Sequence, residues 1–189
     1  MKSIWIAIIC LAAPASLAAA APARAWKVDA AHSMLSFGGT YQGEKFEGRF
    51  RRFEAKTLEY DPARLDAAKF DVVVDIASVD TANSERDQAL PGADFFDTAK
   101  FPQAHFVSTR FRKAADGGVL ADGTLTLRGV AGPVTLAVKF APQGHGATLD
   151  VSTTLKRLDF GIGGGDWSDT TLIGNEVDVH GHLVLVPAG

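Results

Sequence analysis

Segments in which apolar and polar residues alternate recur along this chain, and they constrain its fold more than any other feature. We expect strands at residues 33–37, 46–60, 70–76, 104–111, 121–127, 134–140, 147–155 and 177–185. A period of two places every second side chain on one face, as in a strand with one face buried. Turn residues such as Gly132 and Pro133 separate the segments. The pattern predicts an all-β protein of eight strands.

In two of the predicted strands, the positions of the phenylalanines predict which face of the strand each ring occupies. In residues 46–60, Phe50 and Phe53 fall on opposite faces, which predicts a β-bulge around Arg51–Arg52. In residues 104–111, Phe106 and Phe111 also differ in parity, so we expect them on opposite faces of one regular strand.

The order of the strands favours an eight-stranded antiparallel up-and-down barrel with one short helix. Consecutive strands joined by short links suit this architecture, because closure removes exposed sheet edges. The helix is expected in "NSERDQAL", residues 83–90, with Asn83 or Ser84 as its N-cap and Pro91–Gly92 at its end.

An eight-stranded interior either fills with side chains or holds one small ligand. Small residues recur on the alternating faces of the predicted strands, at Gly48, Ala55, Ala121, Gly123, Ala147 and Gly181. They either leave space for a ligand or permit close approach and curvature of the strands. Both readings stay open at this point.

The first 25 residues predict a cleaved secretory signal. They combine Lys2, an apolar run from Ile4 and an Ala23-Arg24-Ala25 ending. Cleavage before Trp26 would leave a single domain of residues 26–189 without cysteine, held by its core alone. We therefore expect a periplasmic location. The mature chain would have 17 basic and 22 acidic residues, a balance that argues against nucleic acid as a partner.

No residue pattern points to catalysis or to a metal centre. His180 and His182 share the face opposite to Val179 and Leu183, and a third ligand is not indicated, so a metal-dependent enzyme is the weakest reading. Asp166 and Asp169 flank a glycine-rich loop without a nucleophile. No nucleophile-elbow motif accompanies the serines. We expect neither an enzyme nor a metal site.

Two groups of charged residues have alternative readings. An inward-facing member of Arg49, Arg51 and Arg52 could hold a ligand's head group, although a solvated basic edge is the favoured reading. Arg157 and Asp159 are expected to form a structural pair near one end of the barrel.

The order of motifs resembles the YceI-like family of polyisoprenoid-binding proteins. The resemblance is carried by "WKVDAAHSMLSF", "GRFRRFEAKTLEYDP", "FDVVVDIASVDTANSERDQALPGADFFDTAKFPQAHFVST", "GTLTLRGVAGPVTLAVKF" and "RLDFGIGGGDWSDTTLIGNEVDVHGHL". It implies a lipocalin-like barrel acting as a non-catalytic carrier for an isoprenoid, a quinone or a similar amphipathic lipid. The polar head would lie near one mouth, and no other cofactor is implied.

The aromatic stretch "ADFFDTAKFPQAHF" fits this reading, since one of Phe95 and Phe96 would point inward and close the barrel end or line the cavity, and the other would pack under the helix. Alternation and the resemblance together give the following candidate ligand-binding residues: Phe37, Phe50, Phe53, Val74, Ile76, Phe95, Phe96, Phe106, Leu125, Leu136, Val138, Leu149, Val151, Phe160 and Trp167.

A second hypothesis is a filled barrel that acts through its surface as a partner-binding module. It predicts an exposed apolar patch and no bound lipid. Candidate protein partners under either hypothesis are a membrane redox protein and a second copy of the chain.

Overall fold

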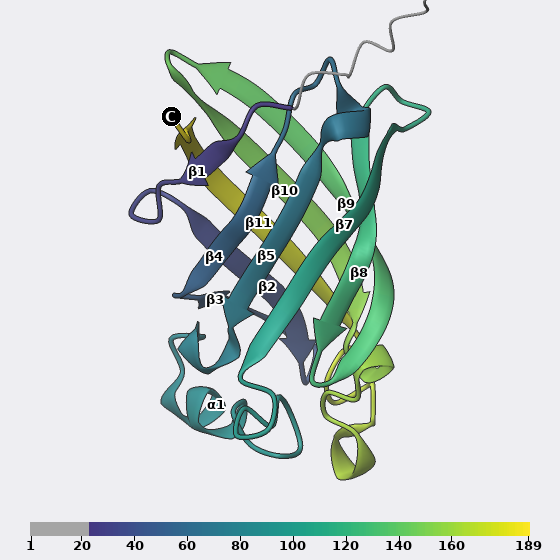
Figure 1. The fold of residues 1–189 in the computed structure, drawn as a ribbon. Helices are drawn as coiled ribbons and strands as arrows, with labels where there is room; N and C mark the ends of the chain where they lie inside the picture. Colours follow the sequence, from purple (N-terminus) through teal and green to yellow (C-terminus); the bar gives the residue numbers. More distant parts are fainter. Residues whose placement is uncertain (1–22) are drawn as a thin grey trace, which may run out of the picture.

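Eleven strands form one curled antiparallel sheet in residues 23–189, the part of the chain that the computed structural model describes (Figure 1). The strands run in the order β4-β5-β7-β8-β9-β10-β11-β2-β3-β6, and β1 pairs with β11 beside β2. Their bounds are β1 Trp26–Val28, β2 Met34–Tyr41, β3 Glu44–Phe50, β4 Phe53–Glu59, β5 Lys69–Asp75, β6 Val79–Asp80, β7 Gln103–Lys113, β8 Val119–Leu127, β9 Val130–Gln143, β10 Gly146–Lys156 and β11 Glu176–Pro187.

The all-β prediction is confirmed, and the strand count differs from eight for identifiable reasons. β1 and β6 are short additions, and residues 46–60 form two strands instead of one bulged strand. The chain breaks at Arg51–Arg52, where β3 stops pairing with β2 and β4 begins to pair with β5. Backbone hydrogen bonds from Arg51 N to Ser78 O (3.1 Å) and from Asp75 N to Arg52 O (3.0 Å) hold this crossing. The predicted bulge is therefore a strand break.

A bulge does occur in β7, and it overturns the parity of Phe111. The register between β7 and β8 shifts between Ser108 and Arg110. The extra residue reverses which face of the sheet each following side chain of β7 points to, as a β-bulge does. Phe106 and Phe111 are consequently both buried in the core. The prediction that they face opposite ways is wrong.

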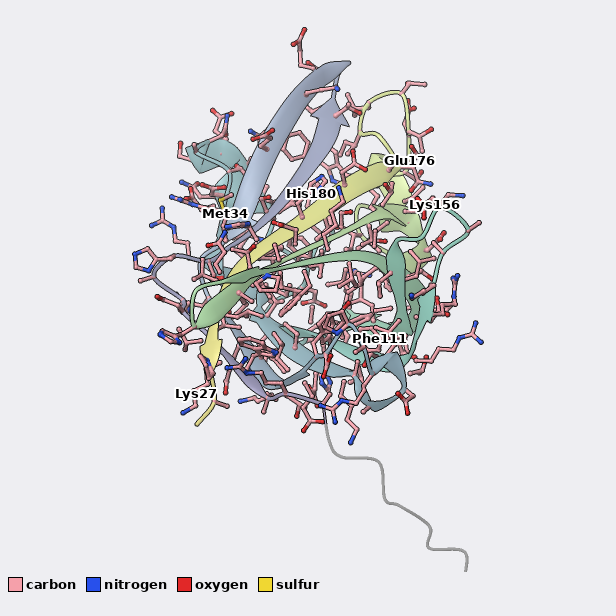
Figure 2. The ribbon with its side chains drawn as sticks, turned by 90° about the horizontal axis from the view of Figure 1, so that it is seen from above. Lys27, Met34, Phe111, Lys156, Glu176 and His180 are labelled. Carbon is pink, nitrogen blue, oxygen red and sulfur yellow. The ribbon has the colours of Figure 1, made fainter. Side chains whose placement is uncertain are left out.

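One end of the curled sheet is filled by aromatic side chains, and we call it the filled end. Trp26, Tyr60, Phe70, Phe111 and Phe140 meet there, with ring centroids 4.8 to 6.0 Å apart. The indole Nε1 of Trp26 donates a hydrogen bond to the carbonyl oxygen of Tyr60 (3.0 Å). This is the upper end in Figure 1, and in Figure 2, which looks onto it, Phe111 lies among crowded side chains. Ring contact and burial make this end a packed core.

The opposite end is covered by the helix and by loops (Figure 1). The helix α1 spans Ser84–Ala89, and the Oδ1 of Asn83 accepts a hydrogen bond from Arg86 N (3.0 Å), so the predicted helix is confirmed with Asn83 as its N-cap. Four 3-10 turns complete the connections, at η1 Leu65–Ala67, η2 Ile76–Ser78, η3 Arg157–Phe160 and η4 Gly165–Trp167.

The predicted signal segment lies outside the described residues except for its last three. Ala25 forms an isolated bridge with Glu59, and the guanidinium of Arg24 lies 4.4 Å from the ring centroid of Trp26. The signal peptide therefore stays a prediction. Within residues 23–189, no helix has the length and apolar composition needed to span a membrane.

Candidate functional site

A cavity of about 480 Å³ opens at the end of the sheet that α1 covers. We call this the cavity end. Its walls come from β2, β3, β5, β7, β8, β10 and β11, and its covers are α1 and the glycine-rich segment between β10 and β11. The lining is mostly apolar, and its clearly polar members are Thr40, Asn83, Glu85, Arg86 and Arg157. A concave apolar pocket of this size with few polar groups is typical of a small-molecule site.

Most of the predicted ligand-binding residues border this cavity. They are Phe37, Phe50, Val74, Ile76, Phe95, Phe96, Leu125, Phe160 and Trp167. They come from strands far apart in the sequence and from both covering segments. Strand alternation therefore located the inner face of the sheet correctly at this end.

The remaining predicted residues do not border the cavity. Phe53, Phe106, Leu136, Val138, Leu149 and Val151 are buried in the hydrophobic core or packed against it. Alternation identifies which side chains point inward, but it does not tell where along the strands the interior is empty. Their contact with a ligand stays a prediction.

Several cavity residues were absent from the prediction. Leu155, Val177, Val179, Ala104 and Leu127 all lie on inner strand faces that the alternation had assigned, so the signal for them existed. The polar residues of α1 gave no such signal, because nothing in the sequence places the helix over the cavity.

The paired phenylalanines of the "DFFD" stretch both border the cavity, whereas only one was expected to do so. The Phe96 ring is buried and lies 6.2 Å from that of Phe50. The Phe95 ring lies 5.6 Å from that of Trp167, so it joins the two covering segments. These rings close the space between α1 and the glycine-rich loop.

The glycines on the inner faces make room for neighbouring side chains of the protein itself. A Cβ atom at Gly48 would lie 2.5 Å from the Phe37 ring, and one at Gly123 would lie 2.5 Å from the Phe106 ring. These distances are far below van der Waals contact. At these positions the small residues permit close packing and do not leave empty space for a ligand.

Arg157 is buried at the edge of the cavity and has backbone carbonyls as its partners. Its five N–H groups donate, over 2.6 to 3.1 Å, to the carbonyl oxygens of Ile162, Gly163, Trp167, Ile173 and Gly174. Within residues 23–189 no carboxylate forms an ion pair with it, so the predicted pairing with Asp159 is wrong. Desolvation lowers the pKa of this guanidinium.

These bonds fix the glycine-rich loop of residues 162–174 to the end of β10. Gly161, Gly163 and Gly165 have φ values of +59° to +67°, a region that favours glycine, and this lets the loop fold around one side chain. Because one guanidinium satisfies five carbonyls, the loop forms a fixed wall of the cavity.

The other side of the cavity mouth carries a second arginine. The Arg86 guanidinium lies 4.3 Å from the centroid of the Phe46 ring, and its Nε donates to the Thr81 hydroxyl (3.0 Å). Asp87 in turn accepts hydrogen bonds from Thr81 N (2.8 Å) and Thr81 Oγ1 (2.7 Å). The first turn of α1 is thus tied to the strand that precedes it.

The other charged candidates lie on the outside of the sheet. Arg49 and Arg51 pair with Asp80 at 3.0 and 2.7 Å, and Arg52 pairs with Asp75 at 2.8 Å. All three arginines are more than half exposed, which fits the solvated basic edge. A backbone hydrogen bond from Ala82, together with Arg49 and Arg51, lowers the pKa of Asp80.

The histidine pair and the loop carboxylates are also on the surface. His180 and His182 are exposed, and His182 Nδ1 lies 2.6 Å from Asp150 Oδ1. Asp166 and Asp169 are exposed, and Asp169 accepts hydrogen bonds from Thr171, which lower its pKa. No group of three His, Cys, Asp or Glu side chains in residues 23–189 is arranged to hold a metal ion.

Comparison with known proteins agrees with this architecture. A UPF0312 protein of Shewanella baltica is 33% identical over 168 residues, covering 85% of this chain and 87% of that protein. The crystal structure of Burkholderia cenocepacia BcnA matches with a TM-score of 0.77 and 34% identity, covering 83% of this chain and 98% of that one. A polyisoprenoid binding domain from Saccharophagus degradans shares the fold, with a TM-score of 0.67 and 20% identity over 87% and 99% of the two chains.

The family assignment follows from the match over nearly the whole described chain. The YceI-like domain matches residues 26–185, from the start of β1 to near the end of β11. The elements that build the cavity all lie inside this range. The chain belongs to the YceI-like family.

Proposed function

We propose that this protein is a non-catalytic carrier that holds the apolar chain of an isoprenoid, a quinone or a similar amphipathic lipid in the cavity. The observation that carries the proposal is the apolar cavity of about 480 Å³, closed on one side by the filled end. The fold neighbour from Saccharophagus degradans, described as a polyisoprenoid binding domain, supports the same ligand class. An apolar chain gains about 0.8 kcal/mol per buried methylene group, so no special chemistry is needed to hold it.

The cavity volume sets the length of chain that it can enclose. At about 480 Å³ the cavity is in the size range of small-molecule sites, so it can enclose a short prenyl chain. The rest of a longer chain would lie outside the mouth or require the filled end to open.

We propose a periplasmic location for the carrier on the basis of the first 25 residues. Their basic start, apolar run and A-x-A ending support export to the periplasm, where a lipid carrier would shield the chain from water. A membrane redox protein and a second copy of the chain remain predicted partners.

The surface-module alternative expects a filled interior. The cavity counts against it, and the exposed large apolar residues lie on several different strands (Met34, Tyr41, Val107, Val130 and Val186). Single exposed apolar residues are normal on a protein surface.

A pair of tryptophan substitutions tests the proposal. Leu125→Trp adds a ring inside the cavity, so we expect at least a tenfold loss of affinity for farnesol and little change in stability. The matched control, Leu185→Trp, makes the same exchange in the buried core and should cost about 1–3 kcal/mol of unfolding free energy with farnesol affinity retained.

Titration calorimetry with farnesol and urea unfolding measure both effects. The proposal fails if the wild-type protein, purified from the periplasm, releases no lipid on organic extraction and also binds neither farnesol nor a short-chain quinone. It also fails if Leu125→Trp leaves farnesol affinity unchanged.

A further inference from the structure

The cavity lining differs in charge from the protein as a whole. The full chain has a formal net charge of −3. The cavity is bordered by two guanidinium groups, Arg86 and Arg157, and by one carboxylate, Glu85. Glu85 is exposed to solvent, whereas Arg86 is half-buried and Arg157 is buried. Because solvent screens an exposed charge more than a buried one, the cavity mouth has positive character.

The two arginines differ in what they can still bind. All five N–H groups of Arg157 already donate to backbone carbonyls, so it has no donor left for a ligand. Arg86 uses only its Nε, on Thr81. Within residues 23–189, no hydrogen bond or ion pair engages its two terminal nitrogens, and no carboxylate neutralises it.

The Arg86 side chain is nevertheless held in place. The ring of Phe46 lies beneath its guanidinium at 4.3 Å, and Thr81, itself fixed by Asp87, accepts from Nε. A guanidinium fixed on one edge and over one face presents its free N–H groups in a defined direction. This is the arrangement in which arginine binds an oxyanion with two parallel hydrogen bonds.

We propose that Arg86 is the head-group contact of the cavity and that it selects lipids with an anionic oxygen head, a phosphate or a carboxylate, over those with a neutral hydroxyl head. This inference rests on the proposed carrier function. Arg157 contributes charge to the site, and Arg86 contributes charge and hydrogen bonds. Thr40 and Asn83, which also border the cavity, supply neutral polar groups near the same mouth.

Ligands that share one chain and differ in the head group test the proposal. Farnesol and farnesyl phosphate share one short prenyl chain and differ in the head group, and inorganic phosphate provides the head alone. Titration calorimetry at low ionic strength compares the wild-type protein with Arg86→Gln, Arg86→Lys and the control Lys113→Gln. Lys113 is an exposed residue at the far end of β7, so its substitution removes one positive charge away from the cavity.

We expect the wild-type protein and Lys113→Gln to bind farnesyl phosphate about tenfold more tightly than farnesol, because charged hydrogen bonds are the stronger ones. Arg86→Gln should abolish this preference, so that farnesyl phosphate and farnesol bind with similar affinity. Arg86→Lys, which keeps the charge, should retain part of the preference. Inorganic phosphate should not compete at millimolar concentration, since the chain supplies most of the affinity.

Other outcomes separate the two proposals. Loss of the same factor of affinity for farnesol and for farnesyl phosphate, in both Arg86→Gln and Arg86→Lys, would show that Arg86 only supports the cavity wall. That result would overturn the head-group role but not the carrier function. A wild-type protein without preference between the two heads overturns it as well. Competition by inorganic phosphate would assign the site to the free anion and overturn lipid head selection. Failure of the wild-type protein to bind either farnesyl ligand would contradict the carrier function itself.

Discussion

The two ends of the curled sheet are built from the same alternating strands, yet one is packed and the other is hollow. At the filled end, Trp26 of β1 and Tyr60 after β4 reach Phe140 on the opposite side, and their rings touch. At the cavity end, the rings of Phe50, Phe96 and Phe37 pack against one another along the walls and leave the centre open. Contact across the sheet, and not the number of aromatic residues, decides whether the interior is filled.

The comparison also separates two roles of the hydrophobic interior, stabilising the fold and providing apolar surface for a ligand. The filled end supplies ring contacts and complete burial, which favour stability. The cavity end gives up such contacts, so apolar surface there remains available to a ligand. A substitution of the same kind should therefore have different consequences at the two ends.

The largest expected difference is in stability. Phe70→Ala removes a ring that is 3% exposed and lies 4.8 Å from Phe111, and it should cost about 4 kcal/mol of unfolding free energy. Phe50→Ala removes the same ring from the cavity wall, where it is half-buried, and should cost about 1–2 kcal/mol. Urea unfolding measures both values. Equal costs would show that the two ends do not differ in packing.

A second, somewhat smaller effect concerns the fixed wall of the cavity. Arg157→Gln leaves most of the five loop carbonyls without a donor, so we expect a loss of about 2–3 kcal/mol. Hydrogen exchange should quicken at the amides of Gly163 and Gly174, which donate to Asp94 O and Thr40 O.

The control for this substitution is Arg52→Gln, which removes an exposed ion pair with Asp75 and should cost less than about 1 kcal/mol. Unchanged exchange of the loop amides in Arg157→Gln would mean that the backbone holds the loop without the guanidinium.

The smallest effect is expected on the outer face of the sheet, behind the filled end. Arg112, Arg110 and Thr135 hydrogen-bond the Asp122 carboxylate and hold its pKa well below its usual range. A carboxyl whose folded-state pKa is depressed adds stability above its unfolded pKa, near 4, and loses it as the pH falls toward the folded value. Asp122→Asn should therefore lower the Tm by a few degrees at pH 7, and the difference should shrink steadily below about pH 4.

Asp166→Asn, at an exposed position of η4, serves as the control for removing a surface carboxylate and should change the Tm little at pH 7. A difference for Asp122→Asn that stays constant from pH 7 to pH 2 would contradict the ion-pair explanation.

Much of the fold could be predicted from local patterns. Alternation in residues 70–76 and 177–185 located two strands and their inner faces. "NSERDQAL" located the helix and left its N-cap open between Asn83 and Ser84, of which the structure has Asn83. The bulge in β7 could not be predicted, because one extra residue near Thr109 changes the register without changing the composition. The facing of Phe111 was wrong for that reason alone.

The site was less predictable because its definition depends on depth and on backbone atoms. Val138 and Leu125 both point inward, but only Leu125 reaches the cavity, and this depends on the rings that fill the opposite end. Arg157 was assigned to Asp159 because a carboxylate is visible in a sequence. Its actual partners are backbone carbonyl oxygens. Because every residue has one, the sequence does not indicate which of them accept hydrogen bonds from Arg157.

If the protein carries a lipid as proposed, the filled end determines the order of events in the transfer of that lipid. Under the proposed carrier function, a lipid chain held in a space that is closed at the filled end would enter tail first and leave head first, through the mouth at α1. The membrane or protein that receives it would therefore contact the polar head before any of the apolar chain is exposed to water. During delivery the chain would slide out along the axis of the cavity, while the receiving surface stays in contact with α1 and the glycine-rich loop.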